Sequence, residues 1–180
     1  MKRRVGIAAA MLLVAALAGC ASVAPLSPAS PGESISGRMS LHVEPIGMER
    51  SHAFAAAFDL RGDPEAGVLG LSTPLGNILA QARWTPGAVE LVTPQGTRRF
   101  TDLGALTRDV LGESVPVEAW FDWLRGRPWA QAPSEPAPGG HGFEQLGWQV
   151  DLARLDDGAI VATRTEPAPT VTVRVQLDRP

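Results

Sequence analysis

The sequence predicts a mainly β (α+β) protein, in which a curved antiparallel sheet forms an unclosed barrel with helices covering its mouth. Two observations predict this class. Apolar and polar residues alternate in several segments, each bounded by turn residues. Two segments with helical spacing interrupt the strands, and their apolar stripes need a surface to cover. A twisted sheet of about nine or ten strands curls, so its concave side is the surface available to the helices.

The first segment is typical of a signal peptide. Residues 1–4 are basic, and residues 5–18 form an apolar run that is shorter than the roughly 20 residues of a spanning helix. The run ends in Leu-Ala-Gly-Cys, which resembles the bacterial lipobox, where the cysteine is acylated and becomes the first residue after cleavage. We therefore predict a lipoprotein signal peptide over residues 1–19. An ordinary signal peptide that contains a cysteine is the alternative.

Cys20 is the predicted site of lipidation, and its acyl chains would anchor the protein. No aspartate follows it, which by resemblance to the enterobacterial sorting rule indicates the outer membrane of a Gram-negative bacterium, with the protein facing the periplasm. Residues 24–32 are rich in proline and serine and have no apolar periodicity. We predict a lipidated cysteine and flexible tether over residues 20–35 and one folded domain over residues 36–180.

Period-two alternation predicts the strands of this domain. It is clearest in residues 39–43, 54–60, 89–91, 148–152 and 171–178. Short turns separate these segments, which implies an antiparallel meander. The whole pattern gives about six strands, then two helices, then three or four strands.

The two helical segments have one apolar stripe each. Residues 103–111 carry apolar side chains at i, i+3, i+7 and i+8, after a cap at Thr101 or Asp102. Residues 116–125 begin with a proline, carry a stripe at i, i+3, i+4 and i+7, and end before Gly126. Residues 126–142 are so rich in proline and glycine that we predict a loop.

Composition excludes several classes of function. After residue 19 the chain has 13 arginines, no lysine and 19 acidic residues, so its formal charge is 13 − 19 = −6, which disfavours nucleic-acid binding. One cysteine and three histidines disfavour a zinc site or a disulfide framework. His42, His52 and His141 are interpreted as solvated, and no hydrolase or phosphate-loop motif is present. We predict a binding protein that is not an enzyme and holds no metal or cofactor.

One turn has an unusual tip. Pro74 and Gly76 fit positions i+1 and i+3 of a tight turn, which leaves Leu75 at the tip, where a polar residue is usual. Two interpretations stay open. The leucine folds back onto a neighbouring strand, or it projects and contacts a lipid or a membrane.

Several pieces of the chain together resemble the LolB family, whose members accept lipoproteins and insert them into the outer membrane. These pieces are the lipobox, residues 37–39, the turn 73–76, residues 89–91 with 95–96, the helices and their ends at 102–112 and 116–128, residues 147–150 and the last strand. The resemblance implies a LolA/LolB-like fold that encloses an apolar cavity. It departs from the family pattern before the first strand, where the family usually has a helix and this chain has a proline-rich tether.

The resemblance also implies partners and site residues. A soluble periplasmic carrier, LolA, would pass the acyl chains of cargo lipoproteins into the cavity, and Leu75 would assist their transfer into outer-membrane phospholipid. We expect a monomer. The candidates for lining the cavity are Phe54, Phe58, Leu71, Trp84, Trp120, Phe121 and Leu124. For each of them, plain packing in a core is the alternative. The rival function is a structural or assembly lipoprotein that binds an outer-membrane protein and transfers no lipid.

Overall fold

The computed structural model describes residues 34–44 and 52–178. The predicted signal peptide, Cys20 and the tether up to residue 33 lie outside the described residues. Within the described part of the chain, no helix is both long and apolar enough to cross a membrane.

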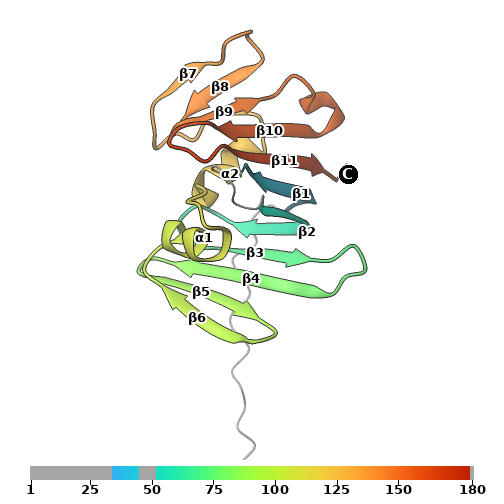
Figure 1. Cartoon of the computed structure of the whole chain (residues 1–180), viewed down its shortest axis with the longest axis vertical. Helices are drawn as coiled ribbons and strands as arrows, with labels where there is room; N and C mark the ends of the chain where they lie inside the picture. The colour runs from blue at the N-terminus through green and yellow to red at the C-terminus, as the bar shows by residue number, and fades with distance from the viewer. Residues whose placement is uncertain (1–33, 45–51, 179–180) are drawn as a thin grey trace, which may run out of the picture.

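Eleven antiparallel strands form one sheet, in the order β6-β5-β4-β3-β2-β1-β11-β10-β9-β8-β7 (Figure 1). The strands are β1 Ile35–Val43, β2 His52–Gly62, β3 Gly67–Ser72, β4 Ile78–Thr85, β5 Ala88–Thr93, β6 Gly96–Phe100, β7 Ser134–Pro136, β8 Gly142–Gln145, β9 Trp148–Asp151, β10 Ala159–Arg164 and β11 Val171–Leu177. In the described residues the outermost strands β6 and β7 each pair with one neighbour only, so the barrel is unclosed. The predicted fold class is confirmed.

Strand β1 lies in the middle of the sheet and brings the two ends of the domain together. It pairs with β2 on one side and with β11 on the other, so that Met39 lies between Ala56 and Val175. Met39, Leu41 and Val43 are buried, whereas the alternate residues of β1 are not. The period-two pattern of the sequence therefore becomes one apolar face, and this face is the concave one that the helices cover.

Two helices cross the concave face. Helix α1 spans Leu103–Leu111, is capped by Asp102 and ends at Gly112, whose φ of +77° suits glycine. Helix α2 spans Val117–Trp123 directly after Pro116. Both predicted helices are confirmed, and the cap at the first one is Asp102, not Thr101.

The prediction of a loop over residues 126–142 is wrong in part. This segment contains β7, and β8 begins at its last residue, so five strands follow the helices where three or four were predicted. Strand β7 is three residues long, is exposed and lies at the sheet edge, where one side of the backbone needs no partner. A proline is tolerated there, so the composition of the segment did not exclude a strand.

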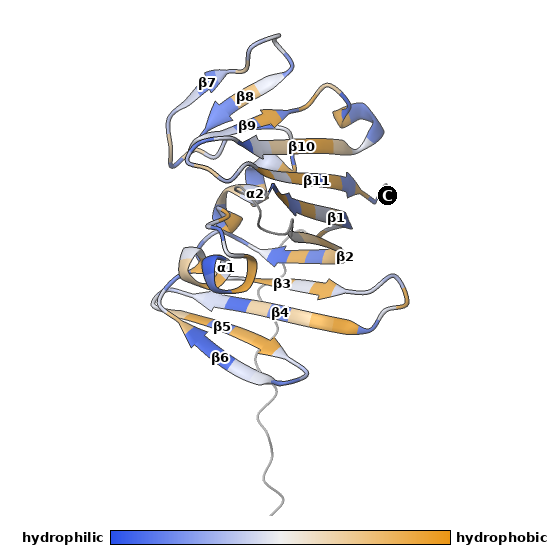
Figure 2. Cartoon of the chain, viewed as in Figure 1, coloured by the Kyte–Doolittle hydropathy of each residue, from blue (hydrophilic) through white to orange (hydrophobic). Residues whose placement is uncertain are grey.

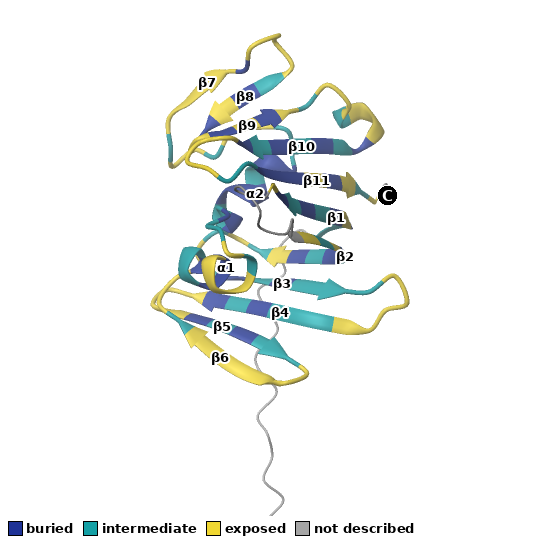
Figure 3. Ribbon diagram, in the orientation of Figure 1, coloured by how far each residue is buried: buried dark blue, intermediate teal, exposed yellow. Residues whose placement is uncertain are grey.

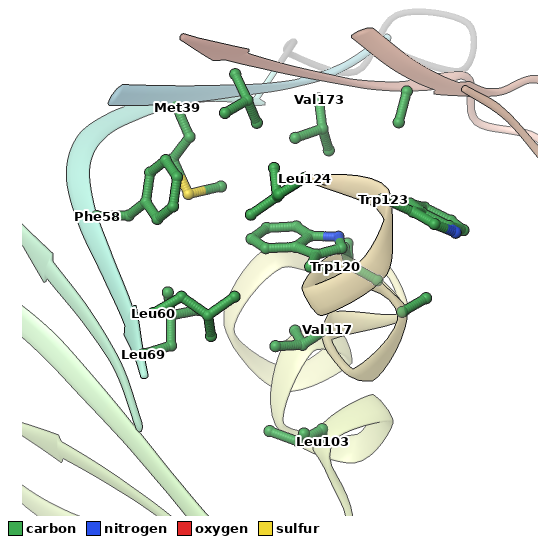
Figure 4. Close-up of a cluster of buried hydrophobic side chains, with 14 of the residues drawn as sticks. Met39, Phe58, Leu60, Leu69, Leu103, Val117, Trp120, Trp123, Leu124 and Val173 are labelled. Atoms are coloured by element: carbon green, nitrogen blue, oxygen red, sulfur yellow. The ribbon is translucent and has the colours of Figure 1, made fainter. Parts of the chain in front are cut away.

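Helix α2 is the centre of the core. All but two of its residues are buried, and Ala119 is fully so. Figure 4 shows Trp120 and Leu124 lying toward Met39 and Phe58 of the central strands. The buried positions run from this helix along the inner face of most strands, whereas β6 and β7 at the two edges are mostly exposed (Figure 3).

Candidate functional site

An enclosed pocket lies between α1 and the concave face of β1 to β5. The sheet contributes Leu41, Leu69 and Ala80 among others, and α1 covers them with Leu106 and neighbouring side chains. Its other walls come from the α1–α2 linker and the start of α2. Strands β7 to β11 contribute nothing to its lining.

The chemistry of this pocket is apolar. Its one polar side chain is Thr107, whose hydroxyl accepts a hydrogen bond from the Val115 backbone N–H at 3.0 Å and lies 3.2 Å from the Gly104 carbonyl oxygen. The hydrogen bonds of this hydroxyl are therefore already made within α1 and the α1–α2 linker, so it is not needed as a partner by a ligand. Such a lining suits hydrocarbon and disfavours any charged or strongly polar group.

The pocket is small in this conformation, with a cavity volume of about 60 Å³. An apolar cavity of about 150 Å³ is the size that accommodates a benzene molecule. A lipid acyl chain is much larger than benzene, so it cannot enter unless the walls move apart. The structure therefore shows the pocket in a closed conformation, and acyl binding would require some of its lining residues to move.

The sequence candidates for the cavity fall into two groups. Three of them, Phe54, Leu71 and Trp120, line the pocket. The other four are buried in the core away from its walls, and they are Phe58, Trp84, Phe121 and Leu124. Two of these pack against each other, because the rings of Trp84 and Phe121 meet edge to face with centroids 6.0 Å apart.

The sequence analysis did not single out most of the pocket walls. The residues it missed include Leu69, Ala80, Leu103, Leu106 and Val117. Leu103, Leu106 and Val117 lie on the predicted apolar stripes of the two helices, whereas Leu69 and Ala80 lie in β3 and β4, for which the sequence analysis gave no bounds. What the sequence does not show is where packing is incomplete, because that depends on the distance between α1 and the sheet.

Within residues 34–44 and 52–178, helix α1 has few polar contacts with the sheet, and its start is capped by its own chain. The Asp102 carboxylate accepts a hydrogen bond from the Ala105 backbone N–H at 2.7 Å, and this bond is the main cause of the lowered pKa of Asp102. The hydroxyl of Thr101 also donates to Asp102 and lowers its pKa further. An ion pair of 2.7 Å joins Asp109 to Arg98 of β6, but both side chains are about half exposed, so it contributes little.

By contrast, the linker between α1 and α2 is bound to the other half of the sheet, through β10. Arg164 of β10 is buried, with its guanidinium 5.6 Å from the ring centre of Trp148, and it pairs with Glu113 of the linker. The Arg164 Nε has no hydrogen-bond partner among the described residues. Breaking this pair would leave a buried charge, so the linker is firmly held.

The turn between β3 and β4 places Leu75 in solvent. Its side chain is 90% exposed, so it does not fold back onto a neighbouring strand. The Gly76 N–H donates to the Thr73 carbonyl and the Thr73 N–H donates to the Asn77 carbonyl, both at 2.9 Å. Gly76 has a φ of +84°. These bonds hold the turn in one shape, so the leucine is presented outward by a fixed backbone.

Two larger hollows lie on the opposite, convex face of the sheet. Each has a volume of about 500 Å³ and is open to solvent, and they share the side chains of Ser40, Ala55 and Arg174. Small residues on β1 and β2 leave these depressions between longer neighbours. Because they are open and border on arginines, they cannot remove an acyl chain from water.

Comparisons with known proteins agree with this architecture. The model of the family described as outer membrane lipoprotein LolB matches residues 34–179. A protein of Bordetella petrii named outer-membrane lipoprotein LolB is 37% identical over 179 residues, which cover 93% of this chain and 89% of that protein. One of the same name from Chromobacterium violaceum is 32% identical over 164 residues, covering 87% of this chain and 86% of its own.

The fold and the site define a class: unclosed antiparallel barrels with an apolar interior covered by helices. The matched family model spans all of the described residues, and the relatives are similar along most of their length. The chain belongs to the LolB family of outer-membrane lipoproteins, which receive lipoproteins and insert them into the outer membrane.

Proposed function

We propose that this protein receives cargo lipoproteins from a LolA-like periplasmic carrier through the pocket beneath α1, and releases them into outer-membrane phospholipid at the β3–β4 turn. It acts as a monomer, anchored through acylated Cys20, and uses no covalent chemistry. The observation that carries the proposal is an uncharged pocket under a helix that few polar contacts hold in place.

The driving force of such a transfer is the burial of methylene groups, each contributing about 0.8 kcal/mol when it leaves water. When an acyl chain moves from one apolar binding site to another, the free energy gained is only the difference between its binding free energies in the two sites. About 1.4 kcal/mol shifts the distribution tenfold. Opening α1 exposes its apolar face, and an entering acyl chain covers that face again, so the tail itself replaces the contacts that α1 loses.

Photocrosslinking tests the pocket. A photoreactive residue at Leu106, on the inner side of α1, is expected to crosslink to a lipidated cargo and not to the same cargo without its acyl chains. The matched control is Ala55, which is exposed on the convex face. Equal crosslinking at both positions, or dependence on the cargo polypeptide alone, would contradict acyl binding under α1.

The second prediction concerns the turn. Leu75→Glu is expected to leave uptake from the carrier unchanged and to slow release into vesicles about tenfold or more, because burying a leucine contributes about 1.5–3 kcal/mol and a charge opposes entry into lipid. Leu75→Met, which keeps an apolar tip, serves as the control. Uptake and release are measured separately, with fluorescent cargo. Normal release by the glutamate variant would remove the turn from the mechanism.

The small closed cavity favours one rival function. A protein whose interior stays packed would serve as a structural or assembly lipoprotein that binds an outer-membrane protein. This rival predicts a stable complex on affinity purification and no uptake of lipidated cargo. The crosslink at Leu106 distinguishes the two functions, because a permanently closed pocket would not react with an acyl chain.

A further inference from the structure

We infer that Ile78 is a second lipid-contacting side chain, so that the end of the β3–β4 hairpin meets the bilayer with two apolar residues. The inference rests on the proposed function, which assigns lipid to the same turn. It adds a residue of this chain that is neither at the tip of the turn nor in the pocket.

Exposure is the first argument. In the described residues four large hydrophobic side chains are exposed: Leu75 at 90%, Ile78 at 70%, Val110 at 46% and Leu146 at 45%. The two most exposed ones are three positions apart on one hairpin. Figures 2 and 3 show the same coincidence, since the start of β4 is both strongly hydrophobic and exposed. Isolated exposed hydrophobic residues are ordinary on a protein surface, whereas neighbours at one projecting end indicate a contact.

The absence of charge around the β3–β4 turn indicates that its partner is lipid. Residues 66–82 contain no charged side chain, and the nearest ones along the chain are Glu65 and Arg83. The β9–β10 connection, by contrast, carries Asp156 and Asp157, and the tight turns that also lack charge interrupt much shorter uncharged runs. A segment without charges can leave water without desolvating an ion, which suits the interfacial region of a bilayer. A body of net charge −6 gains nothing from anionic lipid, so apolar contact has to supply the attraction.

The backbone N–H groups of the turn are largely hydrogen-bonded within the turn, which suits a less polar environment. The N–H groups of Thr73, Gly76 and Asn77 are all bonded within the turn, the last to the Thr73 hydroxyl at 3.2 Å. Ile78 follows directly and pairs with Ser72 as the first residue of β4. Its position relative to the tip is therefore fixed by strand pairing. Fewer unpaired polar groups lower the cost of placing this end in lipid.

Depth measurement tests the inference directly. Ile78→Cys, Leu75→Cys and Leu146→Cys, each in the full chain with Cys20→Ser, carry an environment-sensitive fluorophore on the only thiol. Vesicles of phosphatidylethanolamine and phosphatidylglycerol contain lipids with a quencher on the acyl chain. We expect lipid quenching at positions 78 and 75 and none at 146, which is an exposed hydrophobic residue in a different turn.

The possible outcomes separate this inference from the proposed function. Quenching at 75 without quenching at 78 overturns the inference and leaves the proposed function intact. Quenching at neither position overturns the inference and also removes the β3–β4 turn from the proposed mechanism. A fluorescence change at 78 that depends on protein density and not on the quencher indicates contact between copies of the chain, and this also overturns the inference.

A functional readout completes the test in the lipidated protein. Ile78→Ser is expected to slow release of cargo into vesicles about tenfold, without changing uptake from the carrier. Ile78→Leu should restore release, and Leu146→Ser should leave it unchanged. Because Ile78 is exposed, these variants are expected to fold normally. Unchanged release by Ile78→Ser would overturn the inference.

Discussion

The two halves of the sheet are packed differently. Beneath α1, strands β1 to β5 enclose a pocket, and α1 itself is partly exposed, with Val110 at 46%. In the half formed by β7 to β11, aromatic rings of α2, β8 and β9 pack against one another in the interior. Trp123 meets Phe143 with ring centroids 6.2 Å apart and Trp148 at 6.4 Å.

Polar contacts follow the same division. The buried amide of Gln145 accepts from the Trp123 indole N–H and the Trp129 backbone N–H, and donates to the carbonyls of Trp129 and Ala132, all at 2.8 Å. Nothing comparable joins α1 to the sheet in the described residues. The half formed by β7 to β11, called the frame below, therefore has more buried polar contacts than the pocket half, which we expect to open more readily.

The largest expected effect is on the frame. Trp148→Ala removes a ring that is 2% exposed and packs on Trp123 and Arg164, so the free energy of unfolding should fall by about 3–5 kcal/mol. Leu106→Ala in the pocket half should cost about 2–3 kcal/mol, because the neighbouring space is already incompletely filled. Denaturant unfolding measures both. A loss of about 4 kcal/mol or more for Leu106→Ala would contradict the difference in packing.

A smaller loss is expected from the polar network of the frame. Gln145→Ala leaves the Trp123 indole N–H and backbone groups near Trp129 without partners, so the free energy of unfolding should fall by about 3 kcal/mol. Gln149→Ala, on the exposed side of β9, is the matched control and should change it by less than about 0.5 kcal/mol. Similar values for the two variants would show that the network does not stiffen this half.

The third prediction separates opening from global stability. Arg98→Ala breaks the exposed ion pair to Asp109 and should lower the free energy of unfolding by less than about 1 kcal/mol. Because this pair is one of the few ties of α1, uptake of lipidated cargo should nevertheless become faster. Arg99→Ala, on the same strand but paired with Glu90, is the control. Faster uptake in both variants would point to a general charge effect.

The smallest effect is expected from acid. The pKa of Asp102 is lowered by the Ala105 N–H and the Thr101 hydroxyl, so the cap stabilises α1 fully above the ordinary value of about 4. This stabilisation is lost as the pH falls through the lower, folded value. Hydrogen exchange of the first turn of α1 should therefore speed up in acid beyond its intrinsic pH dependence. Asp102→Asn cannot titrate and should lack this extra change.

The sequence placed five strand segments, both helices and the turn at residues 73–76, because these depend on local periodicity and on turn residues. Whether Leu75 projects from that turn was left open. The short strand β7 was not predicted, because an edge strand of three residues that ends in Pro136 shows no periodicity. The site was predicted less well. Phe58 and Leu71 occupy equivalent inward positions on paired strands, yet only Leu71 borders the pocket. Which apolar residue borders a void is decided by how closely α1 approaches the sheet, and one-dimensional patterns carry no such distance.

The most direct test is the distance between α1 and the sheet with and without acyl cargo. Spin labels at Arg108 of α1 and Thr97 of β6 report on the pocket half, and labels at Glu144 of β8 and Gln176 of β11 report on the frame, each pair in a Cys20→Ser background. Loading with lipidated cargo should lengthen the first distance and leave the second unchanged. Bound cargo with the Arg108–Thr97 distance unaltered would contradict entry beneath α1.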